Sequence, residues 1–73
     1  MSRYTVTYKG EMDPQIDEAL REAIPGWDGS GCMLVAEPPL RDNEFTNTWD
    51  EQAMIETARQ ICGNRFVMVV SYD

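Results

Sequence analysis

The chain contains no histidine, and its six Lys and Arg residues stand against thirteen Asp and Glu residues, for a formal charge of −7. Histidine is the side chain that most often moves protons near neutral pH and a frequent metal ligand, so its absence weakens most enzyme and metal-site hypotheses. The shortage of cations weighs against nucleic acid and anionic membranes, which proteins bind through Lys and Arg. We therefore predict a non-enzymatic protein without metal or cofactor and without direct nucleic-acid or membrane binding.

Long apolar segments are also missing. No run approaches the ~18 residues that span a bilayer, and the N-terminal MSRYTVTYKG lacks the apolar centre of a signal peptide. We expect a cytoplasmic location, where thiols stay reduced. Cys32 and Cys62 have no CxxC spacing and no histidine base beside them. We expect both to be buried structural thiols.

What the chain does contain is enough apolar material for a fold. Hydrophobic residues make up 42% of its 73 positions and fall in clusters separated by Gly and Pro. This composition predicts one small acidic α+β domain over residues 1–73. A core of this size gives only ~3–5 kcal/mol of net stability.

The first half of the chain begins with a strand and a helix. Residues 3–9 alternate apolar and polar side chains with many β-branched and aromatic residues, which is typical of a half-buried strand. Asp13 before Pro14 predicts a helix N-terminus. The helix continues to residue 24, and Pro25 with Gly26 ends it.

The rest of the chain predicts two strands, a helix and a last strand. We expect a glycine-rich loop over 26–31, a strand over the apolar run 32–36 and a strand over 41–49. The second helix begins after either Thr48 or Asp50 and ends at Gly63. A final strand covers 65–72.

The order strand, helix, strand, strand, helix, strand is the split β-α-β-β-α-β pattern of ferredoxin-like folds. The pattern predicts an α+β fold with a four-stranded antiparallel sheet and two helices on one face. The first and third strands would be central, and the second and fourth would be edges.

Two features suggest local chemistry. Asp42 and Glu44 are two apart, so on a strand both carboxylates project from one face, where they would either bind a cation or be solvated and paired with Arg3 and Lys9. The second interpretation is favoured. Trp27, between glycines, either folds back as a lid on the core or stays exposed as a binding anchor, and the lid is favoured.

The open face of the predicted sheet carries no aromatic ring, which argues against RNA binding. We expect it to present Thr5, Thr7, Val35, Thr46, Val67 and Val69. The apolar, uncharged edge strands make a homodimer through an edge or this face a further expectation.

The acidic charge is concentrated. Residues 11–56 hold twelve of the thirteen acids but only two cations, Arg21 and Arg41. We therefore hypothesise a protein-binding domain that presents an acidic surface to a basic patch on a larger partner. In size and charge the chain resembles phage-encoded inhibitors of host defence, such as anti-CRISPR proteins and DNA mimics. The alternative is a dimeric small-ligand sensor or accessory subunit that uses the open sheet face. The residues predicted to bind the partner are Asp17, Glu18, Glu22, Trp27, Asp42, Glu44, Asp50, Glu51 and Glu56.

Overall fold

The structure, a computed structural model, describes residues 1–33 and 35–72. It has the α+β fold that the sequence predicts, with the elements in the expected order. They are β1 (Ser2–Lys9), α1 (Pro14–Ala23), β2 (Trp27–Met33), β3 (Leu40–Asn47), α2 (Glu51–Cys62), a short 3₁₀ turn (Gly63–Arg65) and β4 (Phe66–Ser71).

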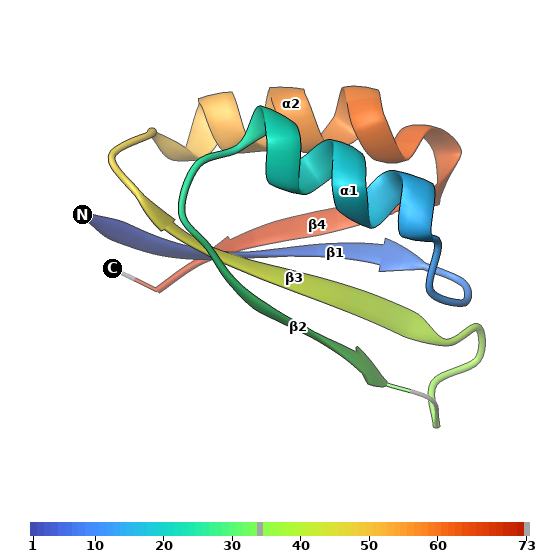
Figure 1. Cartoon of the computed structure of the whole chain (residues 1–73). Helices are drawn as coiled ribbons and strands as arrows, with labels where there is room; N and C mark the ends of the chain where they lie inside the picture. The colour runs from blue at the N-terminus through green and yellow to red at the C-terminus, as the bar shows by residue number, and fades with distance from the viewer. Residues whose placement is uncertain (34, 73) are drawn as a thin grey trace.

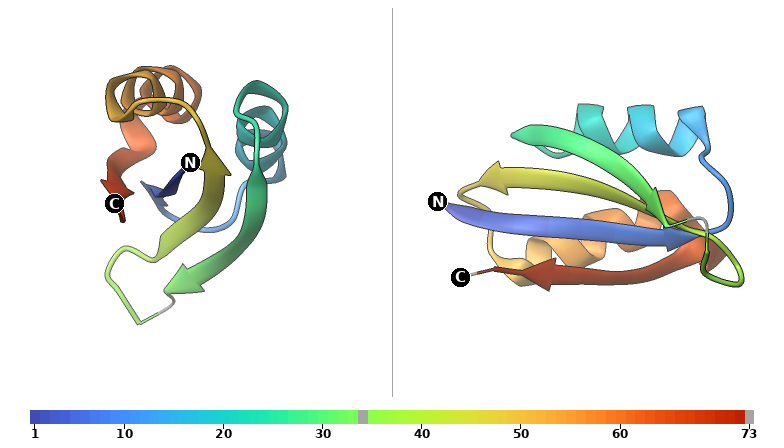
Figure 2. Two further views of the ribbon diagram at one scale, coloured as in Figure 1. Left: turned by 90° about the vertical axis from the view of Figure 1, so that its left-hand side faces the viewer. Right: turned by 90° about the horizontal axis from the view of Figure 1, so that it is seen from below.

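The four strands form one antiparallel sheet in the order β2-β3-β1-β4. The first and third strands are central and the other two are edges, as predicted. Both helices lie on the same face of this sheet (Figure 1), and the view from below shows the strands side by side on the other face (Figure 2). The helices therefore cover one face of the sheet and leave the other face open.

The core lies between the helices and the sheet, and β1 supplies its centre. Tyr4, Val6 and Tyr8 alternate along the strand on its helix-facing side and are almost fully buried. Thr5 and Thr7 on the other face are buried as well, so the expectation of a half-buried strand is wrong. They pack with residues of both helices and of β3, namely Leu20, Ile24, Phe45, Met54, Ala58 and Cys62. The predicted burial of Cys62 is confirmed.

Both helices begin where side-chain capping predicts. The Asp13 carboxylate accepts a hydrogen bond from the backbone N–H of Gln15 at 3.0 Å, and Pro14 is the first residue of α1. For α2 the structure decides between the two predicted starts, because Asp50 accepts from the N–H of Ala53 at 2.8 Å. Such caps satisfy N–H groups that have no partner within the helix.

The second strand was predicted in the wrong place. β2 covers Trp27–Met33, so most of the expected glycine-rich loop is strand and pairs with β3, Ser30 opposite Asn43, with one register shift between Trp27 and Gly29. Only positions 32 and 33 of the predicted strand belong to β2; Leu34 lies outside the described residues, and Val35 is 94% exposed in a turn. An edge strand has one neighbour and little to pack against, so it tolerates glycines and needs no apolar run.

The open face also differs from the prediction. Val69 pairs with Val6 and packs against the core, so it belongs to the helix-facing side. Tyr72 brings an aromatic ring to the open face, since its hydroxyl accepts from the Thr5 hydroxyl at 3.0 Å. The expectation of a face without aromatic rings is therefore wrong. Asp42 and Glu44 project from this same face beside the threonines of β1, and their negative charges would repel the phosphates of RNA.

Candidate functional site

A groove of about 820 Å³ runs between α1 and the edge strand β2. The helix wall repeats at intervals of three and four residues, which is the spacing of one helix face. The floor comes from alternate positions of β3, whereas the two strand-wall residues of β2 are three apart, because the pairing of β2 with β3 shifts register between Trp27 and Gly29. The lining residues are Met12, Pro14, Asp17, Glu18, Arg21, Glu22, Trp27, Ser30, Arg41 and Asn43.

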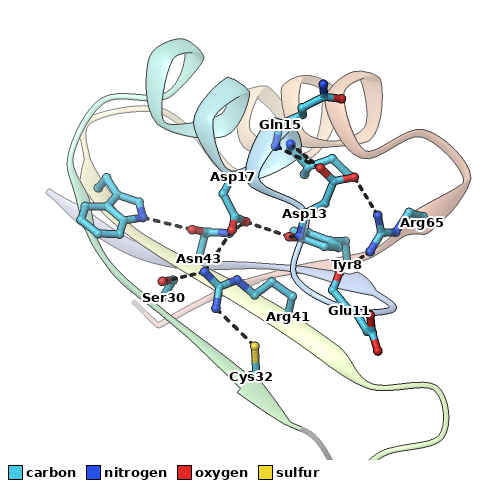
Figure 3. Close-up of polar contacts among 12 residues, drawn as sticks. Tyr8, Glu11, Asp13, Gln15, Asp17, Ser30, Cys32, Arg41, Asn43 and Arg65 are labelled. Atoms are coloured by element: carbon cyan, nitrogen blue, oxygen red, sulfur yellow. Dashed lines mark hydrogen bonds and ion pairs between the residues drawn. The ribbon is translucent and has the colours of Figure 1, made fainter.

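Asp17 lies at the floor of the groove and accepts three side-chain hydrogen bonds. One carboxylate oxygen accepts from the Tyr8 hydroxyl at 2.8 Å and from the Asn43 amide at 2.9 Å. The other accepts from Nη2 of Arg41 at 3.0 Å (Figure 3). Burial alone would raise the pKa of Asp17, but these three hydrogen bonds and the Arg41 charge outweigh it and lower the pKa. Asp17 is thus a buried, ionised centre that connects α1 to the sheet.

Arg41 is the cation of this centre, and its side chain is only 12% exposed. Besides Asp17, its guanidinium donates to the Ser30 hydroxyl at 3.0 Å and to the sulfur of Cys32 at 3.2 Å (Figure 3). Its Nε is buried without a hydrogen-bond partner among the described residues. The expectation that Cys32 is buried is wrong: its thiol is exposed beside the groove because β2 is an edge strand.

Trp27 forms the end of the groove near the C-terminus of α1. Its indole N–H donates to the side-chain carbonyl of Asn43 at 3.1 Å, and Arg21 lies over its ring, 4.1 Å from guanidinium carbon to ring centroid. The residue remains 37% exposed. It is therefore neither a lid on the core nor a free anchor, since one edge is fixed to the floor and a cation covers the ring.

The groove brings together four of the nine residues predicted to bind a partner: Asp17, Glu18, Glu22 and Trp27. The prediction for Asp17 is wrong in one respect, because its carboxylate is buried and fully engaged, while Glu18 and Glu22 are exposed. Asp17 shares a helix face with buried Leu20, so α1 turns it toward the sheet.

Asp42 and Glu44 lie apart from the groove, on the open face. Asp42 accepts from the Thr7 hydroxyl at 2.7 Å, and Glu44 lies 3.8 Å from Arg3. They border a small hollow of about 220 Å³ that also contacts Tyr72. Within residues 1–33 and 35–72, no three Cys, Asp or Glu side chains gather closely enough to hold a metal ion.

The remaining three predicted residues lie on or just before α2. Asp50 is the cap of that helix, so its carboxylate has a structural partner. Glu51 and Glu56 are exposed, and Glu56 accepts from Gln52 at 3.1 Å. The nine predicted residues are thus distributed over three surfaces and do not form one continuous site.

Sequence reasoning missed the cationic, hydroxyl and amide members of the groove, namely Arg21, Arg41, Ser30 and Asn43. A signal was present for two of them. Arg21 and Arg41 are the only cations within the acidic segment 11–56, and both line the groove. An isolated cation in an acidic segment indicates a specific internal partner, because a solvated acidic surface has no need of one.

Together, the sheet, its two helices and the groove between α1 and β2 define a small α+β domain with a polar, tryptophan-bordered cleft. The chain matches none of the family models, curated proteins or solved structures with which it was compared. Within the described residues, no helix is both long enough and apolar enough to cross a membrane.

Two buried groups, the Tyr8 hydroxyl beside Asp17 and the Cys62 thiol in the core, predict that the protein loses stability at alkaline pH. Burial, together with Asp17, raises the pKa of Tyr8 to about 12, above its ordinary value of 10.0, and burial raises that of Cys62 to about 11. A raised folded-state pKa contributes stability that is complete below the unfolded-state value and disappears as pH rises through the folded one. The free energy of unfolding in urea should therefore fall between pH 9 and 12, from 9.0 to about 11 through Cys62 and from 10.0 to about 12 through Tyr8.

Two variants test the assignment of this alkaline loss. Tyr8→Phe should reduce the slope between these pH values and Cys62→Ala should reduce it further, whatever either does to absolute stability. A slope that is the same in the wild type and in both variants would show that other groups cause the loss.

Proposed function

We propose that the protein is a non-enzymatic binding domain that receives a basic segment of a larger protein at the groove between α1 and β2. The observation that carries this proposal is the combination of two exposed carboxylates, Glu18 and Glu22, with the Trp27 ring along one groove. Aromatic anchors beside charged rims are characteristic of protein interfaces.

The distribution of ion pairs supports a cationic partner. Arg41 and Arg65 are bound to carboxylates of the same chain, at 3.0 Å from Asp17 and Asp13 respectively. Among the described residues, Glu18 and Glu22 have no Lys or Arg nitrogen within 4.0 Å. The chain thus pairs Arg41 and Arg65 internally, while Glu18 and Glu22 at the groove rim have no ion-pair partner in the described residues.

In this mechanism the protein occupies a basic site on its partner. Carboxylates on the groove rim would take Lys or Arg side chains that otherwise bind phosphates or other acidic groups. The charge of −7 steers encounter with a basic surface, and salt weakens that steering by screening it. The likeness to phage-encoded inhibitors of host defence stays a prediction from size and charge.

Charge reversal tests the groove as the binding surface. We expect Glu18→Lys combined with Glu22→Lys to weaken binding of a fluorescein-labelled oligo-arginine peptide by at least about tenfold, because attraction becomes repulsion at the rim. Fluorescence anisotropy at low and at physiological ionic strength measures the affinity. The wild-type affinity should fall as salt rises.

The matched control is Glu51→Lys combined with Glu56→Lys, which changes the net charge equally but on α2. Asp50 is left out of this control because it caps the helix, and its loss would cost about 1 kcal/mol of stability. Equal weakening by the two double variants would refute a site at the groove and leave only general charge attraction.

The alternative proposal, a dimeric ligand sensor or accessory subunit, is favoured by the hollow beside Tyr72 on the open face and by the exposed Val67 and Met68 of the edge strand β4. It differs in predicting thermal shifts with metabolites that depend little on salt. We further propose that the fold is ferredoxin-like, which the element order and the central position of β1 and β3 support.

A further inference from the structure

Arg21 and Trp27 form a contact that connects the end of α1 to the start of β2. The guanidinium carbon lies 4.1 Å from the centroid of the indole ring, the shortest of the four cation-π distances in the described residues. Tryptophan is the aromatic side chain that attracts cations best, and arginine is the usual cation. At Trp27 the groove therefore already contains a bound guanidinium from its own wall, separate from that of Arg41 on the floor.

This guanidinium is not held by any carboxylate in the described part of the chain. Arg21 has no Asp or Glu oxygen within 4.0 Å, although Glu18 and Glu22 line the same groove. Its side chain is also exposed at the surface of α1. An exposed cation-π contact is worth only about 0.5–1 kcal/mol, so the Arg21 side chain can leave the ring at small cost.

The environment around Trp27 suits a second cation as well as the first. The indole is fixed by its N–H bond to Asn43, so the ring stays in place when Arg21 moves. Glu18 and Glu22 flank Arg21 in the helix, and they supply the charge complementarity that Arg21 itself does not use. Ring and carboxylates together match a guanidinium from outside.

We propose that a partner's arginine displaces Arg21 from Trp27, so that Arg21 is an internal competitor for the binding site. This inference rests on the proposed function, since it names the side chain of the basic segment that enters the groove. The incoming guanidinium stacks on the ring, and neighbouring basic residues of the partner meet Glu18 and Glu22. Arg21 then turns toward solvent along the exposed side of α1.

The test is Arg21→Ala, measured by anisotropy with the labelled oligo-arginine peptide. Removal of any cation tightens binding of a cationic peptide somewhat, so Arg59→Ala is the matched control. It removes the same charge from α2, where Arg59 lies 5.5 Å from the centroid of the Phe66 ring. We expect Arg21→Ala to bind the peptide about two- to fivefold more tightly than Arg59→Ala, which is the factor set by one exposed cation-π contact.

A second readout reports whether the peptide reaches the ring. The indole N–H signal of Trp27, identified in the NMR spectrum by its persistence in Trp49→Phe, should shift on addition of the peptide. Trp27→Leu should weaken binding, and the added effect of Arg21→Ala should vanish in that background.

The outcomes separate this inference from the proposed function. Equal affinities of Arg21→Ala and Arg59→Ala, with binding still lost on reversal of Glu18 and Glu22, would overturn the exchange of arginines and keep the groove as the site. Binding that is unaffected by Glu18, Glu22 and Trp27 alike would overturn both.

Discussion

Replacing Asp17 with alanine is expected to lower the free energy of unfolding by about 3–5 kcal/mol, enough to unfold most of the protein at room temperature. The change leaves the buried Arg41 guanidinium without its carboxylate, and it removes the acceptor of the Tyr8 hydroxyl and the Asn43 amide. An unpaired buried charge costs far more than the loss of an exposed one. Circular dichroism with urea unfolding measures the change.

Glu18→Ala is the control for this prediction, because it removes a neighbouring carboxylate that is exposed. Its effect should stay within about 0.5 kcal/mol of the wild type. The depressed pKa of Asp17 adds a test in acid: its contribution is complete above the unfolded-state pKa of about 3.9 and is lost as pH falls through the lower folded-state value. Equal stabilities of Asp17→Ala and Glu18→Ala would contradict the buried role.

The case of Asp17 shows what the sequence already contained and what it lacked. Asp17, Leu20 and Ile24 follow the i, i+3, i+7 spacing of one helix face and are all buried, although Asp17 was predicted to lie on the exposed, partner-binding side. The identity of its partner was not accessible, because Arg41 is 24 positions away. Arg41 faces Asp17 only because of the register in which β3 pairs with its neighbours, and this register could not be read from the sequence.

Local rules were sufficient where a signal is contained within a few residues. The position of β1, the cap at Asp13 and the order of the elements all depend on neighbours in sequence, and each was predicted correctly. The central position of β1 and β3 followed from that order. These parts of the fold were predictable because propensity and patterning agree there.

β2 was misplaced because its strand character comes from pairing and not from its own residues. The segment Trp27–Met33 contains two glycines and a single acid, and it is a strand because β3 supplies its hydrogen-bonding partner. The groove was not predicted for the same reason. With residues 26–31 interpreted as a loop, the directions of the Ser30 and Trp27 side chains could not be predicted. The register of β2 is what assembles the site.

Gly26 fixes where β2 begins, and Gly26→Ala is expected to destabilise the protein by at least about 3 kcal/mol. The residue has φ +81°, a conformation that L side chains rarely adopt, and a Cβ there would lie 1.9 Å from the carbonyl oxygen of Thr46. The same two residues are joined by a hydrogen bond from the Thr46 N–H to the Gly26 carbonyl at 2.8 Å. The added methyl group cannot be accommodated without separating β2 from β3 at this point.

Gly31→Ala is the matched control, because a Cβ at that position of β2 meets no atom within 4 Å and the residue has no positive φ. It should leave stability unchanged or raise it by up to about 1 kcal/mol, since alanine restricts the unfolded chain. Urea unfolding of both variants decides between a specific close approach at Gly26 and a general preference for glycine in this strand. Equal stabilities would contradict the close approach.

If the Gly26→Ala variant folds, we expect its structural change to be largest in the groove. Trp27 follows Gly26 directly and is fixed by the hydrogen bond from its indole to Asn43. A shift of the chain at Gly26 moves the indole away from Asn43 and from the wall of α1, so the indole N–H signal should change even where the remaining spectrum is native. Binding of the oligo-arginine peptide should weaken in parallel, while Gly31→Ala retains it, because the cation site depends on the position of one ring.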